Sequence, residues 1–383
     1  MQALNSYWQV REYRSKIFSP VEFHRSSGFC FTKNKLLKKR SSLRGKNLQR
    51  LTTDYEGLLK RYSMEKNFIQ KRNSTGVTTF PVIQDAWLFD KNVEIVDCPG
   101  SEYKLPGIVV NNFNELFKSF SSAKIYNSIN IRVDDWYMSD DSNTFTITTG
   151  RTNYYKSLVT NRAIDYALAE GISVRELLEC GPFIHSLKTS SLSNHLGFNG
   201  FVESADGKIA LIFRKKGMSI GEETYSNSVT ASLKIKYALD ESYLFTKDGL
   251  MNAIIEEIND ELGIPFKTLI TKNNEPIQLI AAYRDVLEGG KPQLLFYAKT
   301  EMTSEQITYA FNSKNTKINC NEKPLAATES MITDGNFIYW IALEDLLKCD
   351  VFPNKFVHDG KNFTMLPSAA ACIVILQEFK NKR

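Results

Sequence analysis

The sequence lacks paired cysteines, closely spaced histidines and long apolar runs, and each absence excludes a class of protein. Its six cysteines are scattered without a CxxC pair and no apolar leader precedes them, so disulfide and zinc frameworks are not expected. The four histidines are far apart, and we interpret His195 as the start of a strand rather than as a base. The apolar run Ala369–Leu376 is far shorter than the roughly 18 residues of a transmembrane helix, so we expect a cytoplasmic protein with no membrane partner.

The amino-acid composition is that of an ordinary globular protein, and the chain is long. Apolar residues make up 42% of the 383 residues and charged residues 24%, which excludes a collagen-like, coiled-coil or wholly disordered chain. At about 150 residues per domain, this length predicts two or three domains. The composition favours a mixed α/β protein.

Positive charge is concentrated at the amino-terminal end. Residues 1–75 hold 17 basic and 5 acidic side chains, whereas the rest of the chain carries a net charge of −7. Aromatic residues such as Trp8 and Tyr13 lie between the basic ones. We therefore expect residues 1–75 to form a basic arm that could meet nucleic acid, an anionic surface or the acidic remainder of the chain.

The middle of the chain predicts a small α/β domain over residues 76–190. Short strand-like runs, broken by Pro and Gly, occur at Phe80–Ile83, Asn92–Val96, Ile108–Val110, Ser128–Val133 and Thr144–Thr148. Two short helices are expected at Asn161–Ala169 and Ser173–Leu178, the second with a capping box formed by Ser173 and Glu176. The Ser- and Thr-rich segment Leu187–Asn194 is then typical of a linker into the next domain.

Two polar groups in this middle region could serve function or structure. Asp134–Asp135 and Asp140–Asp141 could hold a metal ion, but Asp and Ser favour turns, so a polar hairpin loop is the preferred interpretation. The stretch around Arg151 and Arg162 could hold a base or a phosphate, and packing between domains is the preferred interpretation.

Residues 191–383 show the clearest pattern. Leu196–Val202 and Ile209–Arg214 flank Ala205–Lys208, whose Asp-Gly dipeptide is a strong hairpin signal. Later strands are expected at Ile277–Tyr283, Gln293–Thr300 and Asn336–Ile341, with helices at Ser304–Phe311, Leu343–Lys348 and Ser368–Lys380.

The most informative segment is an acidic helix expected at Lys247–Leu262, ended by Gly263. At 100° per residue, Ile254, Ile258 and Leu262 form one apolar stripe. Three carboxylates, Glu257, Asp260 and Glu261, fall together on another side. Carboxylates at this spacing repel one another unless they are solvated or share cations, and hard Mg²⁺ or Mn²⁺ ions suit oxygen ligands. The alternative is a solvated acidic face on a surface helix.

This segment resembles the signature box of the Nudix hydrolase superfamily. The second half of the box, Arg-Glu-apolar-x-Glu-Glu-x-Gly-apolar, aligns without gaps to Glu256–Ile264. Glu257, Glu261 and Gly263 match, and Asp260 is a conservative replacement. In the first half, the family's Gly falls on Ser242 and its first Glu on Asp248. The Arg that opens the second half falls on Glu256, which reverses that charge.

The resemblance implies a carboxy-terminal Nudix-like α/β/α sandwich over residues 191–383 and a metal-dependent activity. Glu257, Asp260 and Glu261 would bind Mg²⁺ or Mn²⁺, and the reaction would hydrolyse a nucleoside diphosphate linked to another group. Glu257 or Glu261 would be catalytic, with Glu322 or Glu329 as other possible bases. Lys215, Lys216 and Lys234 are candidate contacts for the substrate phosphates, the alternative being solvated lysines.

Three functions therefore stand at the level of sequence. The first is a pyrophosphohydrolase on a nucleotide derivative. The second is a non-catalytic nucleotide-binding protein of the same fold, in which the altered box leaves recognition without turnover. The third is a nucleic-acid-associated protein that binds through the basic arm, which would make binding strongly dependent on salt.

Overall fold

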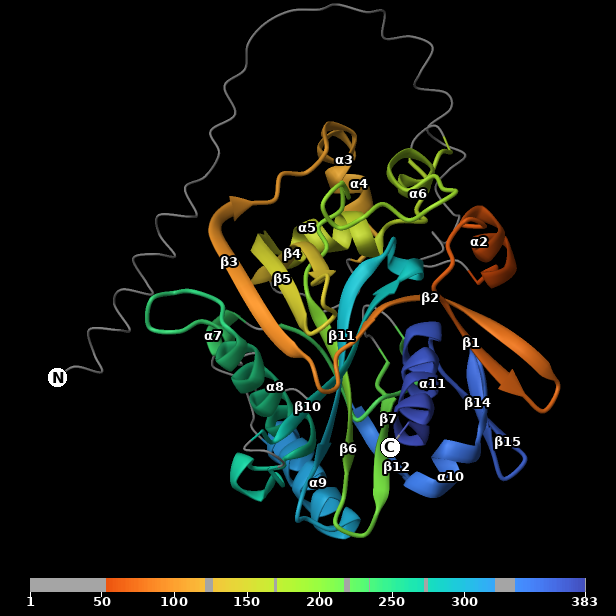
Figure 1. Cartoon of the computed structure of the whole chain (residues 1–383), viewed down its shortest axis with the longest axis vertical. Helices are drawn as coiled ribbons and strands as arrows, with labels where there is room; N and C mark the ends of the chain where they lie inside the picture. Colours follow the sequence, from red (N-terminus) through yellow and green to blue (C-terminus); the bar gives the residue numbers. More distant parts are fainter. Residues whose placement is uncertain are drawn as a thin grey trace, which may run out of the picture. The chain divides into compact units, whose positions relative to one another are not determined.

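The structure is a computed structural model that describes residues 53–120, 127–168, 171–216, 221–233, 235–271, 275–320 and 335–382. All of these ranges belong to one compact unit, Leu48–Arg383. Most of the expected basic arm, residues 1–52, and Lys234, Glu322 and Glu329 lie outside the described residues. The described chain is a mixed α/β protein, as the sequence predicts (Figure 1).

A nine-stranded sheet forms the centre of this unit (Figure 1). Its order is β1 (Phe68–Asn73), β2 (Gly76–Trp87), β10 (Ile277–Asp285), β11 (Lys291–Lys299), β6 (Gly197–Glu203), β7 (Lys208–Arg214) and β12 (Gly335–Ala342), with β8 (Tyr225–Ser226) on β7 and β9 (Val229–Ser232) on β6. The strand pairs are antiparallel except for β11 and β6, which are parallel. The predicted hairpin around Asp206 and Gly207 is confirmed as the β6–β7 connection.

Helices cover both faces of this sheet. On one face lie α7 (Ile235–Ala238), α8 (Lys247–Leu262) and α9 (Ser304–Cys320), with short 3₁₀ turns at Phe266–Thr268 and Val286–Glu288 in the connections. On the other face lie α10 (Leu343–Lys348), α11 (Pro367–Asn381) and a small sheet of β13 (Asp350–Phe352), β14 (Lys355–His358) and β15 (Lys361–Thr364). This is the helix–sheet–helix layering expected for residues 191–383.

Alternation along the strands builds a separate core on each face. Phe198, Val202, Ile212, Leu294 and Phe296 pack with buried residues of α8 and α9. Phe201, Leu211, Ile280, Leu295 and Ile341 pack with buried residues of α11. Because successive strand residues point to opposite faces, the continuous apolar runs of β6, β7 and β11 are explained by cover on both sides.

A second three-stranded sheet lies against the α8 layer (Figure 1). It has the order β3 (Asn92–Glu102), β5 (Thr144–Asn153) and β4 (Ile129–Met138), with β3 parallel to β5. Its Val93, Ile131 and Ile147 join the same core cluster as Ile254 and Ile258 of α8. Helix α8 therefore contacts apolar side chains of both sheets.

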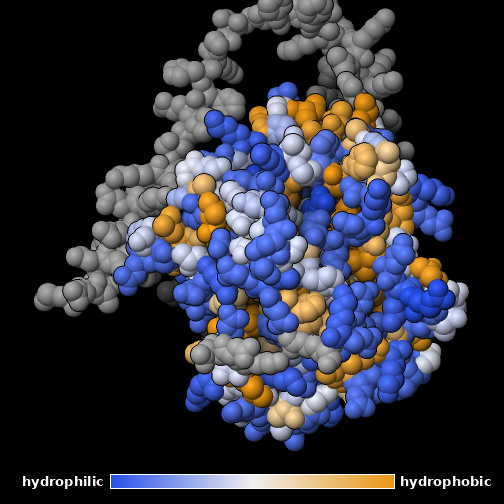
Figure 2. All heavy atoms as spheres, in the orientation of Figure 1, coloured by the Kyte–Doolittle hydropathy of each residue, from blue (hydrophilic) through white to orange (hydrophobic). Residues whose placement is uncertain are grey.

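Short helices accompany the second sheet and leave apolar side chains exposed. They are α2 (Tyr55–Arg61), α3 (Gly107–Asn111), α4 (Phe113–Lys118), α5 (Tyr154–Ser157), a π-helical turn (Leu158–Arg162) and α6 (Val174–Leu178). The capping box predicted from Ser173 and Glu176 is confirmed at the start of α6. Apolar residues gather at the top of the face shown in Figure 2, over α3 and α6, where Ile108, Val110 and Leu177 are exposed.

Some local predictions were wrong. Ile108–Val110 belongs to α3 rather than to a strand, because the β-branched preference of three residues is outweighed by a helical turn begun by Pro106 that buries Val109. The helix expected over Asn161–Ala169 ends at Arg162, as the π-helical turn gives way to a turn. Among helices of the described ranges, none is long and apolar enough to cross a membrane.

The domain limits expected at residues 75 and 191 do not separate the sheets of the structure. The limit at residue 75 falls in the turn of the β1–β2 hairpin, and β2 pairs with β10 from Val82–Asp285 to Trp87–Ala281. Strand β1, at the end of the expected basic arm, and β2, the first strand of the middle region, are thus part of the central sheet. The limit at residue 191 falls just before β6, where Leu192 is fully buried.

Candidate functional site

Helix α8 forms over the range expected from the sequence, Lys247–Leu262. The Thr246 hydroxyl accepts a hydrogen bond from the Gly249 N–H at 3.1 Å, which caps the first turn. At the other end Gly263 adopts a left-handed conformation (φ 73°), which glycine allows without strain. Leu250, Ile254 and Ile258 are fully buried. The apolar stripe thereby orients the carboxylate side of the helix.

The three predicted metal-binding carboxylates differ in burial. The side chain of Glu257 is 1% exposed, whereas Asp260 and Glu261 are half-buried. Lys314 of α9 donates from Nζ to the backbone carbonyls of Asn259 and Asp260, and so brings a positive charge to the carboxyl end of α8. The three carboxylates therefore meet different environments although they lie on one helix.

The donor chemistry of these residues fits a hard divalent cation, because all three supply carboxylate oxygens within two turns of one helix. Across the part of the chain that the structure describes, no group of three His, Cys, Asp or Glu side chains is placed to hold a metal ion together. The metal-site assignment of Glu257, Asp260 and Glu261 therefore stays a prediction.

The lysines predicted to contact phosphate, and the residues at the altered positions of the box, differ in exposure. Lys215 is half-buried directly after β7, and Lys216 is exposed with its Nζ 3.3 Å from Glu223. Ser242 and Asp248, which stand at the first two family positions, are both exposed, and Glu256 is half-buried. The candidate substrate contact Lys234 falls in a gap of the described ranges.

Residues of the second sheet hold the segment that leads into α8. The Asp97 carboxylate accepts from the backbone N–H of Phe245 at 2.9 Å, and Arg151 donates to the Tyr243 carbonyl at 3.4 Å. Asp97 and Arg151 also form an ion pair with each other. Arg151 therefore links the second sheet to the segment before α8, in agreement with the packing role preferred from the sequence. The partner, Asp97, was not predicted, although it directly follows the expected strand Asn92–Val96.

Asp134 and Asp141 likewise have structural partners. Arg132 donates to Asp134, and the Ser101 hydroxyl donates to the same carboxylate at 3.0 Å. Asp141 lies in the β4–β5 turn and accepts from Ser139 at 2.5 Å and from the Asn143 N–H at 3.0 Å. The predicted hairpin loop is confirmed for Asp140–Asp141, whereas Asp134–Asp135 lie within strand β4.

A buried charged cluster, which the sequence analysis did not predict, lies where the π-helical turn meets the β10–β11 connection. Arg162 pairs with Glu288 at 2.6 Å, and Lys291 lies 3.5 Å from the same carboxylate. Burial, and after it the negative charge of Glu288, raise the pKa of the neighbouring Asp285 to about 7, although the positive charge of Lys291 opposes them. Two cations thus face two carboxylates, one of which titrates near neutrality.

His195 is fully buried beside this cluster. Its Nδ1 lies 2.5 Å from the Ser157 hydroxyl and its Nε2 lies 2.9 Å from the Ser232 hydroxyl. Burial lowers its pKa well below the usual value, and the nearby charges of Lys291 and Arg162 add to this effect. The ring is therefore neutral at pH 7, with both nitrogens in hydrogen bonds, just before β6 as the sequence predicts.

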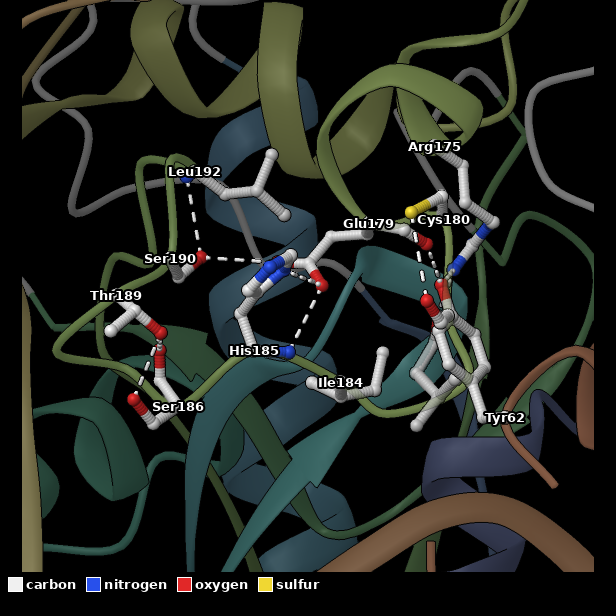
Figure 3. A network of polar contacts seen from close by, with 12 residues as sticks. Tyr62, Arg175, Glu179, Cys180, Ile184, His185, Ser186, Thr189, Ser190 and Leu192 are labelled. Atoms are coloured by element: carbon white, nitrogen blue, oxygen red, sulfur yellow. Dashed lines mark hydrogen bonds and ion pairs between the residues drawn. The ribbon is translucent and has the colours of Figure 1, made fainter. Parts of the chain in front are cut away.

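A second polar network lies beside Cys180 (Figure 3). The Glu179 carboxylate, with a side chain 0% exposed, accepts from the backbone N–H of His185 at 3.1 Å and contacts the His185 ring at 2.9 Å. Burial raises the pKa of Glu179, although the hydrogen bonds from His185 oppose this. In the same view, the buried guanidinium of Arg175 donates to the Tyr62 hydroxyl at 3.1 Å. The contact between Arg175 and Tyr62 joins the end of α2 to α6.

Comparison with known proteins gives no family assignment. No protein-family model matches the chain, and no curated protein matches it either. One similar solved structure is the crystal structure of DR0079 from Deinococcus radiodurans, with 13% sequence identity and a TM-score of 0.24. The match covers 40% of this chain and 69% of that protein.

Proposed function

We propose that the protein is a divalent-metal-dependent pyrophosphohydrolase that acts on a nucleoside diphosphate linked to another group. The observation that carries the proposal is the acidic helix α8, which has the expected bounds and carries Glu257, Asp260 and Glu261 within its last two turns. The layering of helices on both faces of the central sheet agrees with the fold that the Nudix resemblance implies.

In this proposal Mg²⁺ or Mn²⁺ would neutralise the diphosphate and lower the pKa of an attacking water. Glu257, Asp260 and Glu261 would hold the metal. The half-buried Glu261 is better suited than Glu257 to accept the proton of water, because its carboxylate is more open to solvent. Lys215 would attract the phosphate groups from the end of β7, and Lys234 is a further candidate for this role.

A second candidate is a nucleotide-binding protein without turnover. Two observations favour it, namely the 1% exposure of Glu257, which leaves little room for a cation and its water, and the replacement of the family's arginine by Glu256. The fold and the nucleotide ligand would be the same. Only the chemical step would be lost.

The test is Mg²⁺- and Mn²⁺-dependent product release from ADP-ribose, NADH, diadenosine polyphosphates and nucleotide sugars. The Glu261→Gln variant keeps the shape of the side chain but removes its charge, and we expect it to lower turnover about 100-fold. Glu344→Gln is the matched control, because Glu344 is exposed in α10 on the other face of the sheet. Equal turnover in the wild type and Glu261→Gln would refute the assignment, whereas tight nucleotide binding without metal-dependent product formation would support the second candidate.

A further inference from the structure

A cavity of about 610 Å³ lies at the end of the central sheet where β10 begins and β11 ends. The first turn of α8 and the turn between β2 and β3 form its other walls. Its apolar lining includes Leu88, Val93, Met251, Ile277 and Leu279. A cavity of this size is in the usual range for sites that hold small organic ligands.

The cavity exists because β2 leaves the central sheet early. Pairing of β2 with β10 ends at Trp87–Ala281, and the Leu88 N–H makes a last bond to the Ile280 carbonyl at 2.7 Å. Asp90 then adopts a left-handed conformation (φ 62°), and the chain turns into β3 of the second sheet. The first residues of β10, Ile277–Leu279, therefore have β11 on one side and the cavity on the other.

Four lysines from four separate elements line this cavity, namely Lys91, Lys247, Lys299 and Lys380. Two carboxylates, Asp90 and Glu275, also line it. Lys247 pairs with Glu275 at 2.9 Å. The lining therefore carries more positive than negative side chains. The lysines come from segments that are far apart in the sequence.

One carboxylate serves two of these lysines. Glu203 lies 2.9 Å from Lys299 Nζ and 3.8 Å from Lys380 Nζ, and it also accepts from the Tyr297 hydroxyl. The Lys380 ammonium lies 3.7 Å from the centre of the Tyr297 ring, and its side chain is only 18% exposed. Because Glu203 is shared, this wall keeps a positive charge, and partial burial strengthens its attraction for an anion.

We propose that this cavity binds a phosphorylated small molecule of nucleotide size. Its phosphate would lie among Lys91, Lys299 and Lys380, and its organic part would cover the apolar lining formed by Met251 and Ile277. Several lysines around one volume suit a multiply charged anion. This site is additional to the one in the proposed function and does not depend on it.

The geometry of α8 separates the two sites. Met251 and Glu257 are six residues apart, which places them about 9 Å apart along the helix and about 120° apart around it. Met251 faces the cavity, whereas Glu257 belongs to the carboxylate side. Ligand binding in the cavity should therefore need no metal ion.

The test is calorimetric titration of the full chain with ADP in EDTA, with adenosine and inorganic pyrophosphate titrated separately. We expect saturable binding of ADP that weakens with salt, weaker binding of pyrophosphate, and still weaker binding of adenosine, because only ADP offers both phosphate and an organic part. Lys91→Glu should weaken ADP binding about tenfold through reversal of one charge in the lining. Lys361→Glu is the matched control, since Lys361 is exposed on β15.

Two results would overturn this inference. The first is absence of saturable ADP binding at millimolar concentration in EDTA. The second is ADP binding that is unchanged in Lys91→Glu but lost in Glu261→Gln, which would assign the nucleotide to the α8 carboxylates instead. Lys299→Gln provides an independent variant if Lys91→Glu does not fold, and it should also weaken ADP binding. Absence of metal-dependent turnover in the wild type, together with ADP binding in EDTA, would refute the proposed function and leave this inference standing.

Discussion

The Arg151 guanidinium and the Asp97 carboxylate form two parallel hydrogen bonds, each 2.6 Å long. The Asp97 side chain is 3% exposed and also accepts from the Thr149 hydroxyl and the Phe245 N–H. The pair joins two strands of the second sheet to the segment before α8. The middle region of the chain thus has a direct role in positioning the helix of the proposed site.

Replacement of Asp97 by Asn should destabilise the protein by about 3 kcal/mol at pH 7, because it leaves the largely buried Arg151 without its counter-charge. Burial alone would raise the pKa of Asp97, but hydrogen bonds from Arg151, Phe245 and Thr149 lower it below the usual value. The stabilisation is therefore complete above about pH 4 and is lost as pH falls through the lowered pKa. Urea unfolding at pH 7 and pH 3 checks this, with Glu344→Gln as a control. A similar loss of stability in Asp97→Asn at both pH values would contradict it.

The buried Asp285 should make stability fall as pH rises from about 4 to 7. Over this window the folded protein retains a proton on Asp285, whose pKa burial raises to about 7, while the unfolded chain has released it. Asp285→Asn can still accept the hydrogen bond that the Leu287 N–H donates at 3.0 Å. We therefore expect the variant to reduce the slope by up to about 1.4 kcal/mol per pH unit. Urea unfolding of both proteins at several pH values measures this, and parallel curves would refute it.

Gly249, in the first turn of α8, allows close contact with α7. A Cβ atom at this position would lie 1.9 Å from the backbone carbonyl oxygen of Ala238, which cannot move without moving α7. We expect Gly249→Ala to lower the free energy of unfolding by about 2 kcal/mol, although alanine favours helix. Gly107→Ala is the matched control, because a Cβ at Gly107 has no atom within 4 Å. Thermal unfolding of the two variants should separate them, and equal stability would show that α7 adapts without cost.

Local signals allowed several elements of the carboxy-terminal half to be predicted, although the small sheet of β13, β14 and β15 was not. Helix α8 was predicted because its apolar period is bounded by Gly263, and the β6–β7 hairpin because Asp206–Gly207 supports a tight turn. Helix α10 was predicted at its observed bounds, Leu343–Lys348. Each of these three elements is determined by residues only a few positions apart in the sequence.

Contacts between distant segments could not be predicted from one sequence. The pairing of Asp97 with Arg151 depends on the parallel register of β3 and β5, which no local pattern specifies. The cluster of Arg162, Glu288 and Lys291 could not be predicted because charged side chains usually lie on the surface, whereas Glu288 and Lys291 are buried. The carboxylates of α8 were predictable as a group on one helix. Their unequal burial depends on what packs over them.

The pairing of β2 with β10 has a consequence for synthesis on the ribosome. Strand β2 ends at Trp87, but its neighbour β10 is complete only at Asp285. At about 5–20 residues per second, the ribosome adds that stretch in about 10–40 s. During this time the nascent chain presents a strand edge containing Val82 and Ile83, both fully buried in the finished protein, with its later neighbour not yet made. The protein therefore has a long interval in which a chaperone, or another nascent chain, can occupy that edge.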